Sequence, residues 1–301
     1  MILNIFRKHN EDFRQRVGFG RSIQTYHRYE IVYAHLRSFI HSRYHQEDIP
    51  LKDVSINLIT AFEYYLRAER GLKNNSVWVY MITFKHIVSL ARAEGLIIND
   101  PFASYKNRFH QIERGYLTEE DLQRILCYKP EVKMESLVRD LFLFAVFTGL
   151  SYMDVKMLRW ENIRVLFDGQ TWIVTSRRKT RTTSRLLLLD IPQSIIDKRG
   201  DRKTQFVFCV PSNNTCNKYL LEIGRKCAIS PRLTFHIARH TFATLSLSKG
   251  VPIETLSSVL GHTSIRTTQI YAKITNKKIS EDMSALAERL SGMRYEDEGC
   301  L

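Results

Sequence analysis

The sequence lacks the features of a membrane-embedded or secreted protein. No apolar run approaches the roughly 18 residues that a membrane-spanning helix needs. The opening residues mix basic and acidic side chains where a secretion signal would have an apolar core. We therefore expect a protein that is not in a membrane and that stays in the cytoplasm.

Cysteine is also scarce, with five residues in a chain of 301. The five are widely scattered and include neither a CxxC pair nor the closely spaced histidines of a zinc site. We expect neither a disulfide framework nor a metal site. Internal repeats and low-complexity tracts are absent as well.

Positive charge, by contrast, is abundant, and the formal net charge is +14. Residues 1–114 hold 17 Lys and Arg against 11 Asp and Glu, and residues 115–301 hold 28 against 20. Basic side chains that face phosphates release condensed counterions, so a nucleic acid is the first partner to expect. Charge alone leaves open a basic protein without such a partner.

The first part of the chain has the pattern of a small helical domain. From residue 21 to about residue 103, apolar residues recur at helical spacing. We expect a helical domain over residues 21–104, preceded by an N-terminal extension over residues 1–20. Residues 105–116 are polar and basic without a sustained period, which predicts a linker.

The second part, residues 117–276, has the pattern of a mainly helical domain with a small antiparallel sheet. Thr118 is placed to cap a first helix, and a buried helix follows over residues 137–146. β-branched residues on both sides of an Asp-Gly pair predict a hairpin over residues 162–175. A third strand is expected over residues 185–191, and helical patterns return from Thr234 onward.

Two motifs in the last third of the chain are the most informative. His236 and Arg239 form an HxxR pair, a Leu-Gly pair precedes His262, and Tyr271 follows nine residues after that histidine. This ordered set resembles the motifs of tyrosine site-specific recombinases of the phage-integrase family. The resemblance covers roughly residues 20–290.

Cleaving a phosphodiester without a metal requires a nucleophile, charge stabilisation and a proton donor. Tyr271 would attack phosphorus and form a 3′-phosphotyrosyl ester, which a DNA hydroxyl can reverse without ATP. The planar guanidinium of Arg239 suits two phosphate oxygens. The resemblance implies that His236 assists proton transfer, that His262 hydrogen-bonds the phosphate, and that no metal or cofactor takes part.

The resemblance also implies a lysine in a turn of the sheet that protonates the departing 5′ oxygen. Lys179 lies in the expected loop between the second and third strands. Its basic neighbours Arg178, Arg181 and Arg185 are candidates for contacts with the DNA backbone. The alternative is a solvated loop in which every basic residue, Lys179 included, only grips phosphate.

The sequence departs from the family at one catalytic position. Where the family places its first arginine after Thr-Gly-Leu, this chain has Ser151, whose hydroxyl brings no charge. Either the enzyme is inactive, or another cation substitutes; Arg177 is the candidate, since strand alternation would put it on the same face as Lys179. The form TGLSYxDV resembles a Bacteroides-type subgroup that is active despite this change, which favours substitution. Asp154 would support the architecture of the site.

The resemblance implies a C-shaped clamp in which a helical SAM-like core-binding domain and an integrase-type catalytic domain close around double-stranded DNA. A homotetramer would act on specific recombination sites, with possible accessory DNA-bending proteins and an association with the bacterial nucleoid. Residues 277–301 are expected to form a tail for exchange between protomers. Their apolar stripe could instead fold back on its own domain; it comprises Ile279, Met283, Leu286 and Leu290.

The expected activity is DNA inversion or integration and excision, and the sequence does not choose between these. Two other functions remain open. A non-catalytic DNA-binding regulator on the same fold would need only the basic surfaces, and Ser151 favours it. A type IB topoisomerase uses related chemistry, but the spacing from His262 to Tyr271 and the Thr-Gly-Leu motif favour a recombinase.

Overall fold

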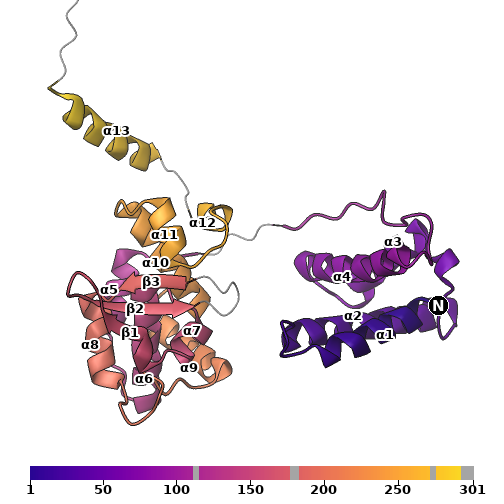
Figure 1. The fold of residues 1–301 in the computed structure, drawn as a ribbon, viewed down its shortest axis with the longest axis horizontal. Coiled ribbons are helices and arrows are strands. Elements are labelled where there is room, and N and C mark those ends of the chain that lie inside the picture. The colour runs from indigo at the N-terminus through magenta and orange to yellow at the C-terminus, as the bar shows by residue number, and fades with distance from the viewer. Residues whose placement is uncertain (111–114, 177–182, 272–275, 293–301) are drawn as a thin grey trace, which may run out of the picture. The chain divides into compact units, whose positions relative to one another are not determined.

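The computed structural model describes residues 1–110, 115–176, 183–271 and 276–292, and for residues 276–282 it describes the backbone alone. The chain divides into two compact units, Met1–Ile112 and Glu113–Leu301, each described here by itself (Figure 1). Among the described residues, no helix combines the length and apolar character needed to cross a membrane.

The first unit is all helical. Its core is formed by apolar side chains from every long helix, with Phe6, Leu36, Phe62 and Phe84 fully buried. The side chains of Ser22 and Ser55 cap the second and third α-helices by accepting hydrogen bonds from backbone N–H groups. The elements are α1 (Ile2–Gln15), α2 (Ile23–Tyr44), η1 (Leu51–Asp53), α3 (Ile56–Tyr64), the π-turn η2 (Tyr65–Glu69) and α4 (Asn74–Ala93).

The expectation that residues 1–20 form an extension outside this domain is wrong. Helix α1 packs against α2 and α4, and its Ile2, Leu3 and Phe6 belong to the core. The carboxylate of Asp48 accepts hydrogen bonds from the backbone N–H groups of Leu3 and Asn4, at 2.9 and 3.1 Å, so the first turn is tied to a distant loop. The apolar face of α1 is interrupted at Asn10, which is buried and donates to Glu30 at 2.6 Å, so the helical pattern is incomplete in the sequence.

The expected linker is also shorter than residues 105–116. The Tyr105 hydroxyl donates to Glu63 at 2.6 Å, and Asn75 exchanges two hydrogen bonds with the backbone of His110. The Phe109 ring packs edge-on against Trp78 of α4. Residues 105–110 therefore belong to the first unit.

The second unit is mainly helical with one small antiparallel sheet, which confirms the predicted fold class. Helix α6 lies at its centre and packs against α8, α9 and α10. The helices before the sheet are α5 (Glu119–Cys127), α6 (Lys133–Thr148), α7 (Tyr152–Lys156) and η3 (Trp160–Asn162). After the sheet come α8 (Asp190–Arg199), α9 (Asn213–Lys226), α10 (Phe235–Ser248), α11 (Ile253–Val259), α12 (Arg266–Gln269) and α13 (Asn276–Leu290).

The sheet has the order β1-β2-β3, formed by Ile163–Val165, Thr171–Ser176 and Thr183–Leu187 (Figure 1). The hairpin is confirmed, but the third strand spans Thr183–Leu187 instead of residues 185–191, and α8 begins at Asp190 with Pro192 in its first turn. Proline lacks an N–H group and is tolerated in the first turn of a helix, where that group has no partner within the helix.

A buried carboxylate joins two helices of the second unit. Asp140 of α6 is almost fully buried and accepts charge-assisted hydrogen bonds from Arg139, Lys198 and Arg199, at 2.7 to 2.9 Å. Burial acts to raise the pKa of Asp140, but the three cations outweigh it and lower that pKa below its ordinary value of 3.8. The ionised carboxylate thus fixes α8 against α6.

We predict that Asp140→Asn lowers the free energy of unfolding by about 3 kcal/mol at pH 7, because three cations lose a buried partner. The pKa of Asp140 is lower in the folded protein than in the unfolded chain. The stabilisation is therefore complete at pH values above the unfolded pKa, and it is lost as the pH falls through the folded pKa. Urea unfolding should therefore show the difference between wild type and variant shrinking below about pH 4. Asp197→Asn, at an exposed position of α8, is the control; an equal loss in both variants would contradict the assignment.

Candidate active site

The arginine of the HxxR pair is buried and hydrogen-bonds to the ends of two other helices. Arg239 lies on α10, whose first turn is capped by the Thr234 side chain, and only 6% of Arg239 is exposed. Its Nη1 donates to the Gly149 carbonyl at 2.7 Å, and its Nη2 donates to the Leu260 carbonyl at 2.6 Å. The same Nη2 lies 3.2 Å from His262 Nε2. One guanidinium thus connects α10 with the ends of α6 and α11.

The contact between Arg239 and the Gly149 carbonyl depends on the backbone conformation of Gly149. It ends α6 in the left-handed conformation, with φ of 66°. A Cβ atom there would lie 2.5 Å from Phe242 Cδ1 and 2.9 Å from Leu260 Cδ2. Glycine is therefore required both for the dihedral angle and for the close packing that presents its carbonyl to Arg239.

Along the chain, His262 precedes α12 and Tyr271 follows it. His262 Nδ1 is 2.8 Å from the hydroxyl of the fully buried Thr268, whose carbonyl accepts a hydrogen bond from the Tyr271 N–H at 3.0 Å. The His262 and Tyr271 rings are nearly parallel, with centroids 6.4 Å apart. Tyr271 is 9% exposed and packs in a small cluster with Leu256 and Leu260. Thr268 thus orients both residues.

A second histidine on α10 completes the group. His240 Nε2 lies 2.9 Å from His236 Nε2, and the His240 ring meets the Tyr271 ring edge-on with centroids 4.8 Å apart. The sequence did not single out His240, although its spacing of four from His236 places both on one helix face. The structure therefore brings together all four motif residues, with His240 between two of them.

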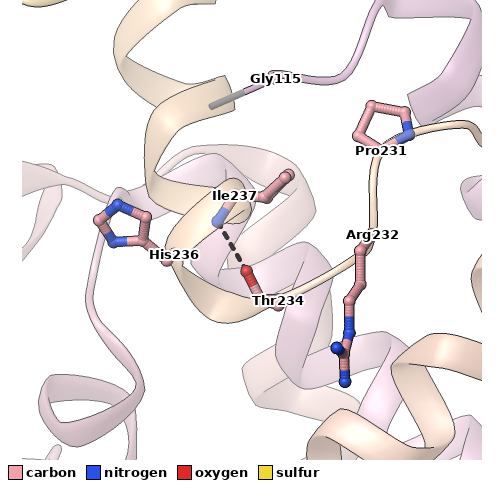
Figure 2. A pocket seen from close by; sticks show the side chains of 6 residues that line it. All are labelled: Gly115, Pro231, Arg232, Thr234, His236 and Ile237. Carbon is pink, nitrogen blue, oxygen red and sulfur yellow. Dashed lines mark hydrogen bonds between the residues drawn. The ribbon is translucent and has the colours of Figure 1, made fainter. Parts of the chain in front are cut away.

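Two adjoining cavities open beside α10. The larger, of about 340 Å³, contains Arg239 and His236 together with the polar side chains of Ser151, Asn213 and Asn217. The smaller, of about 300 Å³, shares Thr234 and His236 with it. Figure 2 shows His236 projecting from the first turn of α10, with the Ile237 N–H bonded to the Thr234 hydroxyl and Arg232 on the chain entering the helix.

Ser151 has a structural role at the position where an arginine was expected. Its hydroxyl donates to Asp154 Oδ2 at 2.6 Å, and its Oγ accepts from the Asp154 N–H at 3.3 Å. The Asp154 carboxylate also accepts from the Ser151 N–H. Ser151 and Asp154 thus form a capping box that begins α7 at the edge of the larger cavity.

The basic loop lies outside the described residues, and with it Arg177, Arg178, Lys179 and Arg181. Arg185 is described: it lies on β3, exposed, opposite Val174 of β2. Within the described part of the chain, no group of three or more His, Cys, Asp or Glu could hold a metal ion.

Known protein families match both parts of the chain. Residues 115–278 match the description "Phage integrase family", and residues 1–109 match "Phage integrase SAM-like domain". The chain belongs to the phage integrase family. Both units of this phage integrase family member therefore have counterparts among known domains.

Relatives of this family member include tyrosine recombinase XerA of Pyrococcus furiosus, with 31% identity over 58% of this chain and 64% of XerA. The chain spans slightly less than two thirds of that relative. Tyrosine recombinase XerC of Oceanobacillus iheyensis is 24% identical over 82% of this chain and 84% of XerC. The Tn1549 transposon integrase, solved with transposon right end DNA, has the same fold: the TM-score is 0.73 at 15% identity, covering 95% of this chain and 99% of the other.

We predict that Gly149→Ala lowers the free energy of unfolding by about 2–4 kcal/mol, because the methyl group adds a clash to an unfavourable dihedral angle. Gly169→Ala is a matched control: its φ is 71°, but nothing lies within 4 Å of the new Cβ. It should cost only about 1 kcal/mol. Urea unfolding followed by circular dichroism measures both, and equal losses would show that the packing against Phe242 and Leu260 contributes nothing.

Proposed function

We propose that this protein is a site-specific DNA recombinase that cleaves and rejoins DNA through a 3′-phosphotyrosyl bond to Tyr271. One observation carries the proposal. The Tyr271 ring meets the His240 ring edge-on and lies nearly parallel to the His262 ring, and His262 contacts the buried Arg239. A phenol beside cationic and imidazole groups is the set that metal-free phosphoryl transfer needs.

In the proposed reaction, Tyr271 Oη attacks the scissile phosphorus while the bond from phosphorus to the 5′ oxygen breaks. His236 assists removal of the phenol proton, and Lys179 donates a proton to the departing 5′ oxygen. Arg239 and His262 stabilise the negative charge of the transition state. Attack by a 5′ hydroxyl then reverses the step and releases Tyr271, so neither metal nor ATP is consumed.

The proposed substrate is double-stranded DNA that carries specific recombination sites. The charge of +14 supports it. Arg178, Arg181 and Arg185 would contact the backbone, and the two units would close around the duplex as a C-shaped clamp. The reaction would be inversion, or integration and excision, with possible accessory DNA-bending proteins.

We propose that the active form is a homotetramer held together by residues 277–301. Helix α13 supports this, because Met283, Leu286 and Leu290 are apolar and exposed. Apolar side chains at these helical spacings form a stripe that a neighbouring protomer can cover.

We also place the chain in the subgroup that has serine at the first arginine position, with Arg177 as the substitute cation. The larger cavity supports a need for such a cation, because among the described residues that line it Arg239 is the one arginine or lysine. The neutral side chains of Ser151, Asn213 and Asn217 border the same space. A second candidate function, a non-catalytic DNA-binding regulator, is favoured only by Ser151.

We predict that the wild-type protein forms a covalent complex with DNA and that Tyr271→Phe does not, because phenylalanine has no oxygen to attack phosphorus. The probe is a nicked duplex selected from a random-sequence pool by covalent capture on the wild type. A slower-migrating, denaturant-resistant band measures the complex. Tyr219→Phe, which removes a phenol hydroxyl elsewhere in the second unit, should behave as wild type.

Two outcomes would contradict the proposal. A covalent band from Tyr271→Phe would assign the nucleophile to another residue. Failure of the wild type to capture any duplex of the pool covalently, with binding to pool duplexes retained, would identify the regulator.

We predict that Arg177→Ala slows formation of the covalent complex about 100-fold or more, because one charged donor to the transition state is lost. Arg164→Ala, on exposed β1 of the same sheet, is the matched control and should retain the wild-type rate. A near-normal rate for Arg177→Ala would overturn its role and assign the missing hydrogen bonds to the neutral side chains of the cavity.

A further inference from the structure

One histidine in the group has no role in the chemistry described above. His240 contacts two reacting residues at once: its Nε2 lies 2.9 Å from His236 Nε2, and its ring lies edge-on to Tyr271. It follows Arg239 directly in the chain and is partly buried. The HxxR pair accounts for His236 and Arg239 but leaves His240 unassigned.

We propose that His240 is a positioning residue that fixes His236 and the Tyr271 ring in their reactive orientations. The inference rests on the proposed function, because it concerns the same strand cleavage. His240 itself need not touch the DNA. Its effect reaches the scissile phosphate through the two residues that it holds.

The contact with His236 restricts where protons lie. A hydrogen bond between two imidazole nitrogens needs one nitrogen with a proton and one without. His236 and His240 therefore cannot both carry a proton on Nε2 while the contact is kept. His240 thus selects the protonation form and the ring orientation of His236, which the proposed reaction uses to accept the phenol proton.

The contact between His240 and Tyr271 restricts the orientation of the Tyr271 ring. Aromatic rings favour edge-to-face arrangements at centroid distances of about 4.5–7 Å, and the His240 and Tyr271 rings meet this description at 4.8 Å and 75°. The Tyr271 ring also lies nearly parallel to the His262 ring, with centroids 6.4 Å apart. The phenol ring is thus near two imidazoles, one of which is hydrogen-bonded to the buried Thr268 while the other is positioned by α10.

Within the described part of the chain, the titratable and charged groups that contact His240 or its partners belong to one cluster. His236 and Arg239 are on its own helix, Tyr271 follows α12, and His262 lies between α11 and α12. Removing the His240 ring therefore alters the environment of His236 without removing a charge that binds phosphate directly.

Three variants separate the two contacts. His240→Ala removes both. His240→Gln places an amide near the position of Nε2 and keeps a hydrogen-bonding partner for His236. His240→Phe keeps a ring against Tyr271 but has no hydrogen bond to offer. Thr244→Ala, one turn further along α10, is the matched control.

The experiment measures single-turnover formation of the covalent complex against pH on the selected nicked duplex, together with the Kd for that duplex and the Tm. We expect His240→Ala to slow the reaction about 10- to 100-fold, as misplacement by about 1 Å does, with the Kd unchanged within about twofold. Its pH profile should change shape, because His236 has lost its partner. At least one of the Gln and Phe variants should recover most of the rate.

Recovery by His240→Gln assigns the positioning to the hydrogen bond, and recovery by His240→Phe assigns it to the ring contact; either supports the inference. A wild-type rate and pH profile for His240→Ala would overturn it. So would a uniform loss of rate in all three variants that follows a lowered Tm, because that is a folding role. Absence of a covalent complex with the wild type would instead count against the proposed function.

Discussion

The buried guanidinium of Arg239 is the interaction on which the second unit depends. An arginine stays charged, so removing it from water is costly unless its N–H groups are paired. Two backbone carbonyls, those of Gly149 and Leu260, meet this need. Because these carbonyls end α6 and α11, the requirement to pair one charge fixes the relative placement of three helices. The positions of His262 and Tyr271 depend on that placement.

The sequence allowed the helices of the interior and the hairpin to be predicted, because apolar periodicity and the Asp168-Gly169 turn are local signals. Prediction from the sequence failed where contacts between residues far apart in the chain determine the structure. Helix α1 has interrupted apolar spacing and is tied in place by Asp48, a residue far along the chain. The boundary between β3 and α8 depended on Pro192, which is compatible with both a strand edge and a helix start.

The motif residues of the site could be predicted from the sequence, but the residues that contact and orient them could not. The resemblance of their ordered motifs to those of tyrosine recombinases identified His236, Arg239, His262 and Tyr271, and the structure brings them together. The roles of Thr268 and His240 were not predictable, because a threonine in a short helix and a histidine beside an arginine are common. Their function arises from contacts that only the folded chain creates. The roles of the basic loop, from Arg177 to Arg181, remain predictions.

The capping box at Ser151 ties one residue of the cavity edge to the start of a helix. The serine hydroxyl and the Asp154 carboxylate satisfy the first backbone groups of α7, so the residue is committed to the helix start. An arginine there would add a charge but remove the cap, at a cost of about 1 kcal/mol. The serine therefore exchanges a cation at the cavity for a firmer start of α7, so local folding and site charge draw on the same position.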